Sequence, residues 1–375
     1  MSARRAVTDP MNETPLHSEM IEIPDSAGAA TRLFFERGWS DGLPVLPPTE
    51  AAVREMFRYT DREPDDVVAI LPPRYGEATV EKIAINAVMA GCLPEYLPVL
   101  VATVQAMSDE RLNLSQILTS THGCSPLVMV GGPLIKELRL NFGYHTSGEG
   151  LRSIATIGRA ISLIAWNIAG LPGRTNVDTF GAITRYHHVF AENEDQSPWE
   201  PLHVERGLER HASAVSVFGA EPAHHIDDMG STTAQGMLTT LVNTLPGAGT
   251  RHFQEFGEPL IVLGPQHAQI IANGGYSKAD VKRFIYEHAR LPVSKHSQEN
   301  FEKVCQVTAP KWYCNLAPEA LIPIAESRDD IVVVVSGGPG SHSLFIPQQV
   351  YVRSVTKAVT RKDGTPIRSV KDFLQ

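Results

Sequence analysis

A buried strand followed by a glycine-proline turn occurs twice in this chain and constrains its fold more than any other feature. The first copy, Ser125–Gly150, contains the apolar run Leu127–Val130 and the turn Gly132-Pro133. The second copy, Pro259–Tyr276, contains the turn Gly264-Pro265, and in both copies Asn, Gly and Tyr follow the proline at offsets of 8, 10 and 11. A repeat of this kind predicts duplicated strand–helix units.

The order of the expected elements is that of an α/β fold. Continuous apolar runs at Leu127–Val130, Leu260–Leu263 and Ile331–Val335 favour strands that are covered on both faces. Amphipathic segments that begin after Thr79 and Ser277 predict capped helices. We therefore expect an α/β protein with internally duplicated strand–helix units and a C-terminal strand unit that joins the same layer.

The chain divides into three expected segments. Residues 1–28 form a polar N-terminal tail, residues 29–211 form a first α/β half with a polar loop, and residues 212–375 form a second half that ends in a glycine-rich strand unit. Within the two halves, we expect a strand at 114–120 and a helix at 318–327.

Composition excludes several classes of protein. Of the 375 residues, 42% are hydrophobic and 20% charged, with a net charge of −9, which argues against a nucleic-acid-binding surface. We expect no membrane-spanning segment and no signal peptide. Four cysteines without a C-x-x-C pair do not form a disulfide scaffold. A cytoplasmic protein is the expectation, and a homodimer is expected because closed symmetric dimers are common.

The glycine-rich loop before the helix at 151–169 is a candidate anion site. Its backbone N–H groups and the helix N-terminus attract carboxylate or phosphate. Gly148, Gly150 and Arg152 are therefore candidate substrate-binding residues. The loop has neither the Walker spacing nor the dinucleotide-binding glycine spacing, so no nucleotide cofactor is indicated.

Histidines gather in expected loops and at strand ends. They are His122, His145, His187, His188, His224, His225, His267 and His342. Imidazole titrates near neutral pH, so these residues are candidates for acid–base catalysis or for a divalent metal. The expected metal ligands are His224, His225 and Asp227, with Glu192 and Glu194 as further oxygen donors.

The acidic segment Ala191–Leu202 contains the preferred catalytic residue, Glu192. We expect Glu192 to act as general acid or base with His145, His187 or His188. The alternative is an acidic loop that is merely solvated. Further candidate substrate contacts are Asn193, His267, Ser341 and His342.

Cys124 provides an alternative chemistry. It lies two residues after His122, whose imidazole would favour the thiolate. A thiol-dependent redox or covalent enzyme is therefore a second hypothesis, and a non-catalytic ligand- or metal-binding protein is a third.

Four segments of the chain together resemble the long form of the UGSC (seleno)protein family. They are 41–49 (DGLPVLPPT), 84–91 (AINAVMAG), 191–202 and 335–342. The family is largely uncharacterised, so the resemblance implies little about the substrate. The Sec/Cys-Gly-Ser-Cys motif that names the family is absent from this chain, which counts against thiol or selenol redox chemistry.

The function predicted from the sequence is that of a small-molecule enzyme. We expect a hydrolase or lyase that uses Glu/His acid–base chemistry on a small polar anionic substrate. The reaction is expected in a cleft between the two halves, at the carboxyl ends of the strands.

Overall fold

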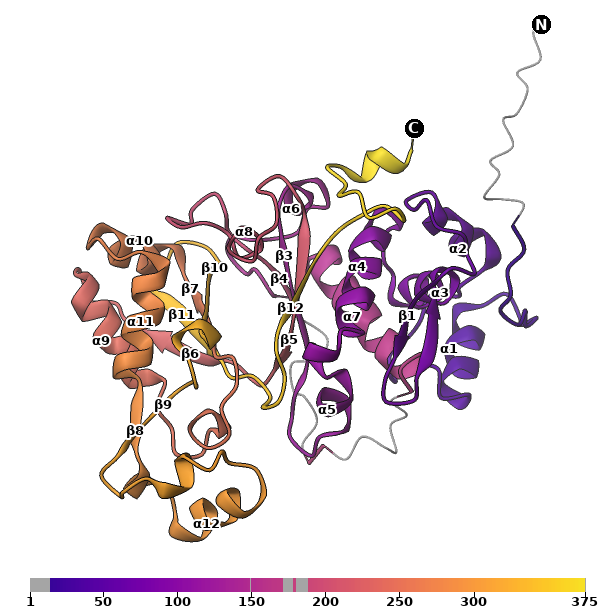
Figure 1. The fold of residues 1–375 in the computed structure, drawn as a ribbon. Helices are drawn as coiled ribbons and strands as arrows, with labels where there is room; N and C mark the ends of the chain where they lie inside the picture. Colours follow the sequence, from indigo (N-terminus) through magenta and orange to yellow (C-terminus); the bar gives the residue numbers. More distant parts are fainter. Residues whose placement is uncertain (1–13, 149, 171–177, 180–187, 375) are drawn as a thin grey trace, which may run out of the picture.

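The computed structural model describes residues 14–148, 150–170, 178–179 and 188–374, and two four-stranded mixed sheets form its centre (Figure 1). The sheets pack face to face, and helices cover their outer faces. The expected α/β class is confirmed. Among the described residues, no helix has the length and apolar character needed to cross a membrane.

The first sheet has the order β12-β5-β3-β4. Its strands are β3 (Ser125–Gly131), β4 (Val189–Ala191), β5 (Ala214–Ala220) and β12 (Val355–Ala358). β3 pairs parallel with β4, while β5 pairs antiparallel with both β3 and β12. Every residue of β3 and β5 is buried, as the continuous apolar run predicted for the first of these strands.

The second sheet has the order β10-β7-β11-β6. Its strands are β6 (His224–Asp227), β7 (Leu260–Leu263), β10 (Val332–Val335) and β11 (His342–Ile346). β10 and β7 are parallel, and β11 pairs antiparallel with β7 and β6. Both sheets thus show one parallel pairing followed by two antiparallel pairings. A duplicated unit would give this pattern, and the duplication itself stays a prediction.

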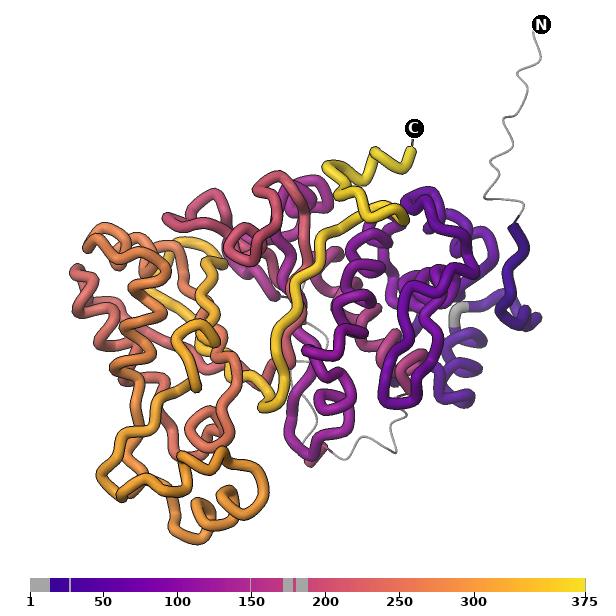
Figure 2. Tube along the Cα trace, in the orientation of Figure 1, coloured from indigo at the N-terminus to yellow at the C-terminus, as the bar shows by residue number. Residues whose placement is uncertain are grey.

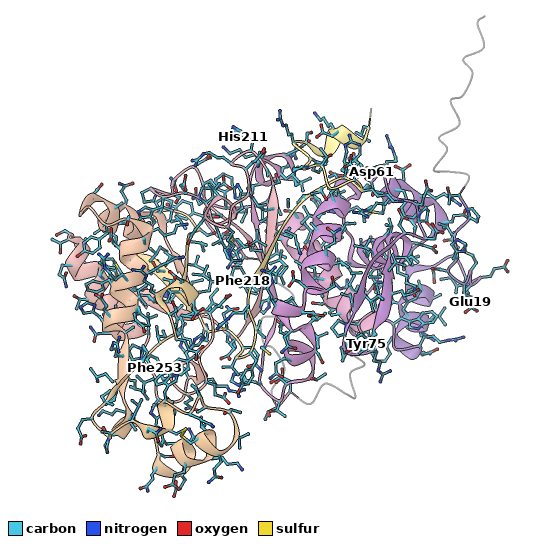
Figure 3. All side chains as sticks on the ribbon, in the orientation of Figure 1. Glu19, Asp61, Tyr75, His211, Phe218 and Phe253 are labelled. Carbon is cyan, nitrogen blue, oxygen red and sulfur yellow. A yellow bond between two sulfur atoms is a disulfide. The ribbon has the colours of Figure 1, made fainter. Side chains whose placement is uncertain are left out.

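Side chains alternate between the inner and outer layers. Leu127 and Met129 of β3 meet Leu260 and Val262 of β7 in the core between the sheets, beside Phe218, which Figure 3 labels near the centre of the molecule. The residues between them along each strand point to the outer helices. Strand periodicity therefore fixes a four-layer helix–sheet–sheet–helix arrangement.

Two sets of helices form the outer layers. Those against the first sheet are α3 (Val80–Ala90), α4 (Leu97–Met107) and α7 (Arg152–Asn167). Those against the second sheet are α9 (Ala234–Thr244), α10 (Pro265–Asn273) and α11 (Lys278–His288).

Shorter elements extend the two halves. They are α1 (Ala27–Glu36), α2 (Glu50–Phe57), β1 (Val67–Leu71), β2 (Gly76–Thr79), α5 (Leu114–Thr119), α6 (Leu134–Glu137), α8 (Leu202–Glu205), β8 (Arg290–Pro292), α12 (Gln298–Val307) and β9 (Leu321–Pro323). A disulfide joins Cys305 of α12 to Cys314, whereas Cys92 and Cys124 are buried thiols.

Local sequence signals place several helix ends correctly. The Thr79 hydroxyl accepts the Lys82 N–H at 3.2 Å and starts α3, and Gly91 ends that helix with a φ of 89°. Ser277 and Asp280 form a reciprocal capping box at the start of α11. These interactions lie within one turn, so the sequence contains all the information they require.

Two expected elements are wrong. The expected strand at 114–120 is instead α5, which Asn113 starts by accepting the Gln116 N–H. The expected helix at 318–327 contains the short strand β9, which pairs with β8. In both cases the apolar residues are buried as expected, but tertiary contacts select the other backbone conformation.

The first sheet takes two of its strands, β5 and β12, from the second half of the sequence, whereas all four strands of the second sheet come from that half. The chain passes from β5 in the first sheet to β6 in the second, and later returns from β11 to β12. Figure 2 shows this C-terminal segment running beside β5. The expected boundary between residues 211 and 212 therefore does not separate the two sheets, because β5 belongs to the first.

Candidate active site

The carboxyl ends of β3 and β4 bring Glu192 beside the Gly131-Gly132 backbone. The Glu192 N–H donates to the Val130 carbonyl at 3.0 Å and continues the parallel pairing. Gly132 has a φ of +88°, and a Cβ there would lie 2.4 Å from the Ala212 carbonyl oxygen. Only glycine fits this turn, which brings the backbone close to the acidic segment.

Glu194 and His203 complete a cluster with Glu192. The Gly132 N–H donates to Glu194 Oε1 at 2.5 Å, and the N–H of Leu202, at the start of α8, donates to Glu192 Oε2 at 3.0 Å. His203 Nδ1 lies 3.9 Å from Glu194 Oε1. One ligating atom from each of the three side chains lies within 4.8 Å of the others, so the cluster has the composition of a metal site.

Two buried atoms of this cluster lack hydrogen-bond partners among the described residues. They are Glu192 Oε1 and His203 Nδ1. His203 Nε2 lies 3.4 Å from the Arg210 carbonyl oxygen, which can only accept, so Nε2 carries the ring proton. Nδ1 is then a bare lone pair. The cluster therefore contains three converging acceptors, and its balance requires a proton or a cation.

Burial controls ionisation in this cluster. It raises the pKa of Glu192 to about 7, while the Lys278 ammonium and the Leu202 N–H act in the opposite direction. Burial lowers the pKa of His203, which keeps its imidazole neutral. Lys278 is itself held by the Glu200 carbonyl at 2.5 Å and by Glu205 at 3.1 Å.

A cavity of about 510 Å³ opens onto the cluster. Its lining combines Glu192 and Glu194 with Gly132, Pro133, Ile135, Lys136, Phe142, Asp195, Arg210 and His211. His211 is labelled at the outer surface in Figure 3, so the cavity opens near the exterior. All of these residues belong to the first half, and the expected cleft between the halves is corrected accordingly.

Asn193 joins the two sheets rather than facing the cavity. Its N–H donates to the Val335 carbonyl at 2.7 Å, and its side chain donates to the Gly337 carbonyl at 2.9 Å. The Ser336 hydroxyl donates back to the Ala191 carbonyl at 2.7 Å. These bonds fix the end of β4 against the end of β10 and so position Glu192, which gives Asn193 a structural role in place of the expected substrate contact.

Two predicted catalytic residues lie at the opposite end of the sheet. His188 precedes β4, where its Nδ1 is hydrogen-bonded to the Ser125 hydroxyl at the start of β3. The three residues of β4 lie between His188 and Glu192, which separates the two by roughly 13 Å. Cys124 lies beside Ser125, is 3% exposed and contacts the Ile117 carbonyl through Sγ. The expected convergence of Glu192 with His188 is wrong, and His187 lies outside the described residues.

The glycine-rich loop residues have mainly structural contacts. Arg152 donates through Nε and Nη2 to the Gly91 carbonyl, at 3.1 Å each, and thereby ties α7 to the end of α3. The ring of exposed His145 covers Gly148 so closely that a Cβ there would lie 1.9 Å from Nε2. Gly150 has a φ of +87°, which a side chain would strain.

The remaining predicted contacts lie in the second sheet. His267 is buried, with its Nδ1 2.8 Å from the Ser343 hydroxyl and its Nε2 3.2 Å from the Asp228 carbonyl oxygen. The backbone N–H of Asp228 donates to the Ser341 carbonyl at 3.3 Å. The expected metal set requires one correction. His225 and Asp227 do come together, but His342 completes their group, because His224 points to the other face of β6.

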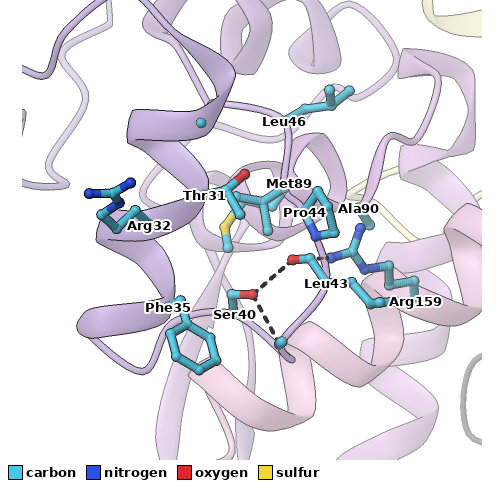
Figure 4. A pocket seen from close by; sticks show the side chains of 13 residues that line it. Thr31, Arg32, Phe35, Ser40, Leu43, Pro44, Leu46, Met89, Ala90 and Arg159 are labelled. Carbon is cyan, nitrogen blue, oxygen red and sulfur yellow. Dashed lines mark hydrogen bonds between the residues drawn. The ribbon is translucent and has the colours of Figure 1, made fainter.

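A second, larger recess of about 710 Å³ lies between α1 and the segment 40–46 (Figure 4). Ser40 and Arg159 of its lining are bonded to the segment 40–46. The Ser40 hydroxyl bonds to Gly42 and Leu43, and Arg159 forms a paired contact with Asp41. The described lining contains arginines but neither a carboxylate nor an imidazole, in contrast to the cavity beside Glu192.

Models of known protein families give no match to this chain, and no relative is found among curated proteins. The resemblance to the UGSC family therefore stays a prediction. The class that the fold and the site define is an α/β protein with paired mixed sheets and a buried carboxylate–imidazole cluster. Sequence reasoning identified Glu192 and Glu194, but it missed His203, which no spacing motif marks.

Proposed function

We propose that this protein is an enzyme of the hydrolase or lyase class and that Glu192 is its general acid or base. The observation that carries the proposal is the buried Glu192 Oε1, which has no hydrogen-bond partner among the described residues although Glu192 lines a cavity. An unsatisfied buried carboxylate oxygen is costly, and functional sites are where such a cost is commonly retained.

The protonation balance of Glu192 suits this role. A group with a pKa of about 7 is present in both forms near neutral pH, which is where general acid–base catalysis is most effective. In the basic form, Glu192 takes a proton from water or from a substrate carbon. In the acidic form, Nδ1 of the neutral His203 imidazole can accept a hydrogen bond from the protonated Glu192 carboxyl, which holds the proton between turnovers.

The charges at the cavity favour a small anion. Lys136 and Arg210 belong to the lining, and both are well exposed, with side-chain exposures of 66% and 62%. Lys136 contacts Asp195 at 2.7 Å and Arg210 lies 4.0 Å from Glu200, and ion pairs as exposed as these are weak and exchange readily. An incoming carboxylate or phosphate can therefore recruit either cation.

The test is a pH–rate profile on any substrate found in a panel of small anionic esters and β-substituted carboxylic acids. We expect a limb with an apparent pKa near 7 in the wild type and its loss in Glu192→Gln. Glu200→Gln, which changes an exposed carboxylate of the same segment, is the matched control. An unchanged limb in Glu192→Gln would remove Glu192 from the mechanism.

A second candidate function is metal-assisted chemistry at the same cluster. The convergence of Glu192, Glu194 and the bare Nδ1 of His203 favours it. The adjacent Lys278 ammonium opposes it, because a fixed cation repels a second one. Removal of divalent ions by a chelator separates the candidates: full activity afterwards supports the proton mechanism, whereas loss of activity that added metal restores supports the metal mechanism.

A further inference from the structure

A second carboxylate–imidazole group lies on the surface of the other sheet, far outside the cavity lining. It consists of His225 and Asp227 on β6 and His342 on β11. β6 is an edge strand of the second sheet. The three side chains are 55%, 62% and 56% exposed, so solvent reaches all of them.

Strand register explains why these three residues meet. His342 lies directly opposite Asp227 in the antiparallel pair, and His225 is two residues before Asp227 on the same face. His224 directly precedes His225 and lies on the other face of the strand, where its ring is 5.8 Å from that of Phe345. The sequence His224-His225 thus divides into one member of the group and one residue outside it.

The donor atoms already converge on one point. His342 Nδ1 lies 2.5 Å and His225 Nδ1 3.2 Å from the same oxygen, Asp227 Oδ1, and the two rings are 4.9 Å apart. Nitrogen and oxygen ligands at about 2.0–2.2 Å from one ion lie roughly 3.3 Å from each other. Small rotations of exposed rings therefore convert the hydrogen-bonded group into a coordination sphere.

The local charges favour a cation. The charges that act on Asp227 are those of the two histidines, and Asp228 follows it in the chain. The buried cluster differs, because the Lys278 ammonium acts on both Glu192 and His203. A divalent ion at the surface group would therefore meet the Asp227 carboxylate and no fixed ammonium among the groups that act on Asp227.

We propose that His225, Asp227 and His342 bind one divalent transition-metal ion of the zinc class, with its remaining positions open to water or to a small donor ligand. Two imidazoles and one carboxylate suit such ions and not Mg²⁺ or Ca²⁺, which prefer oxygen donors alone. Three protein ligands leave at least one open position. This site goes beyond the proposed function and does not depend on it.

Calorimetric titration of the tag-free full chain with Zn²⁺ tests the proposal. We expect one ion per chain in the wild type and affinities reduced at least roughly 10- to 100-fold in Asp227→Asn and His342→Ala. His224→Ala is the matched control, because it removes an adjacent exposed imidazole from the other face and should bind Zn²⁺ as the wild type does. All variants replace exposed side chains, and circular dichroism verifies that they fold.

A second measurement uses histidine modification by diethyl pyrocarbonate, read residue by residue by mass spectrometry. Zn²⁺ should protect His225 and His342 and leave His224 reactive. Equal protection of all three, or wild-type affinity in both ligand variants, would overturn the proposal. Loss of the ion in Glu194→Gln with binding retained in His342→Ala would assign the ion to the buried cluster instead.

Discussion

The two carboxylate–imidazole groups use the same functional groups in opposite environments. Glu192 is 1% exposed beside buried His203, whereas Asp227 lies open to solvent between His225 and His342. Burial raises the pKa of Glu192 to about 7, but hydrogen bonding to His342 lowers the pKa of Asp227. Burial thus favours a carboxylate that exchanges protons near neutral pH, whereas exposure and imidazole donors favour an ionised carboxylate that can bind a cation.

The largest expected effect is a loss of turnover when Glu192, in the buried group, is replaced. Glu192→Gln should lower turnover roughly 100-fold or more, because it removes a general acid or base. The same variant should keep the Zn²⁺ affinity of the wild type, since the surface group is unchanged. Steady-state kinetics and calorimetry on one preparation check both statements, and a joint loss of turnover and Zn²⁺ binding would break the distinction.

The pH dependence of stability should have opposite signs at the two sites. The folded-state pKa of Glu192 is raised from 4.5 to about 7, so its contribution is complete below pH 4.5 and is lost as the pH rises through 7. Glu192→Gln should remove about 3 kcal/mol of this loss. Hydrogen bonding to His342 lowers the pKa of Asp227 from its ordinary value of 3.8, so the contribution of Asp227 is complete above that pH and is lost as the pH falls through the lower folded-state pKa.

Urea denaturation between pH 3 and pH 9 measures these slopes. The Glu192→Gln curve should be flatter than the wild-type curve between about pH 4.5 and 7. Asp227→Asn should change the slope of the curve only on the acid side, where the wild type loses the contribution of ionised Asp227. Parallel curves for the wild type and Glu192→Gln would show that Glu192 ionises normally in the folded chain.

Replacing one histidine of each group by alanine should distinguish the two groups by a smaller difference in the free energy of unfolding. His203 is 1% exposed, so His203→Ala leaves a hole and should destabilise the fold by about 1–3 kcal/mol. His225→Ala changes an exposed side chain and should stay within about 0.5 kcal/mol of the wild type. Thermal unfolding gives the comparison, and equal losses would mean that His225 has packing contacts that its exposure does not indicate.

The smallest expected effect concerns the neighbouring ammonium. Lys278→Met should shift the pKa of Glu192 further upward, because the Lys278 charge favours the ionised carboxylate. Lys282→Met is the matched control: Lys282 lies one turn further along α11 and also pairs with Glu205. Carbon-13 NMR of the glutamate carboxyl groups follows the titration, and an equal shift in both variants would assign the effect to Glu205 instead.

Short-range features of the fold could be predicted from the sequence. The caps Thr79 and Ser277 act within one helical turn, and the run Leu260–Leu263 is a strand with the bounds that its composition predicts. The secondary structure of Leu114–Thr119 was harder to predict. Its apolar residues fit a short strand or a short helix equally well, and the choice depends on a cap at Asn113 and on packing against β3.

The candidate sites show the same limit. Glu192 and Glu194 stand together in one acidic segment, so the sequence pointed to both. His203 joins them only because α8 returns over Gly131, and His342 replaces His224 only because of the register between β6 and β11. Such partners depend on tertiary geometry, which one sequence without a spacing motif does not contain.

The late addition of β12 to the first sheet has a consequence for the synthesis of the chain on the ribosome. β5 leaves the ribosome well before β12, its outer partner, because residues 221–354 lie between the two strands in the sequence. Until then the first sheet has an uncovered edge at β5, and uncovered edges attract foreign strands. The nascent chain is therefore most vulnerable to aggregation after β5 is made and before β12 is made, and the pairing of β12 with β5 covers this edge.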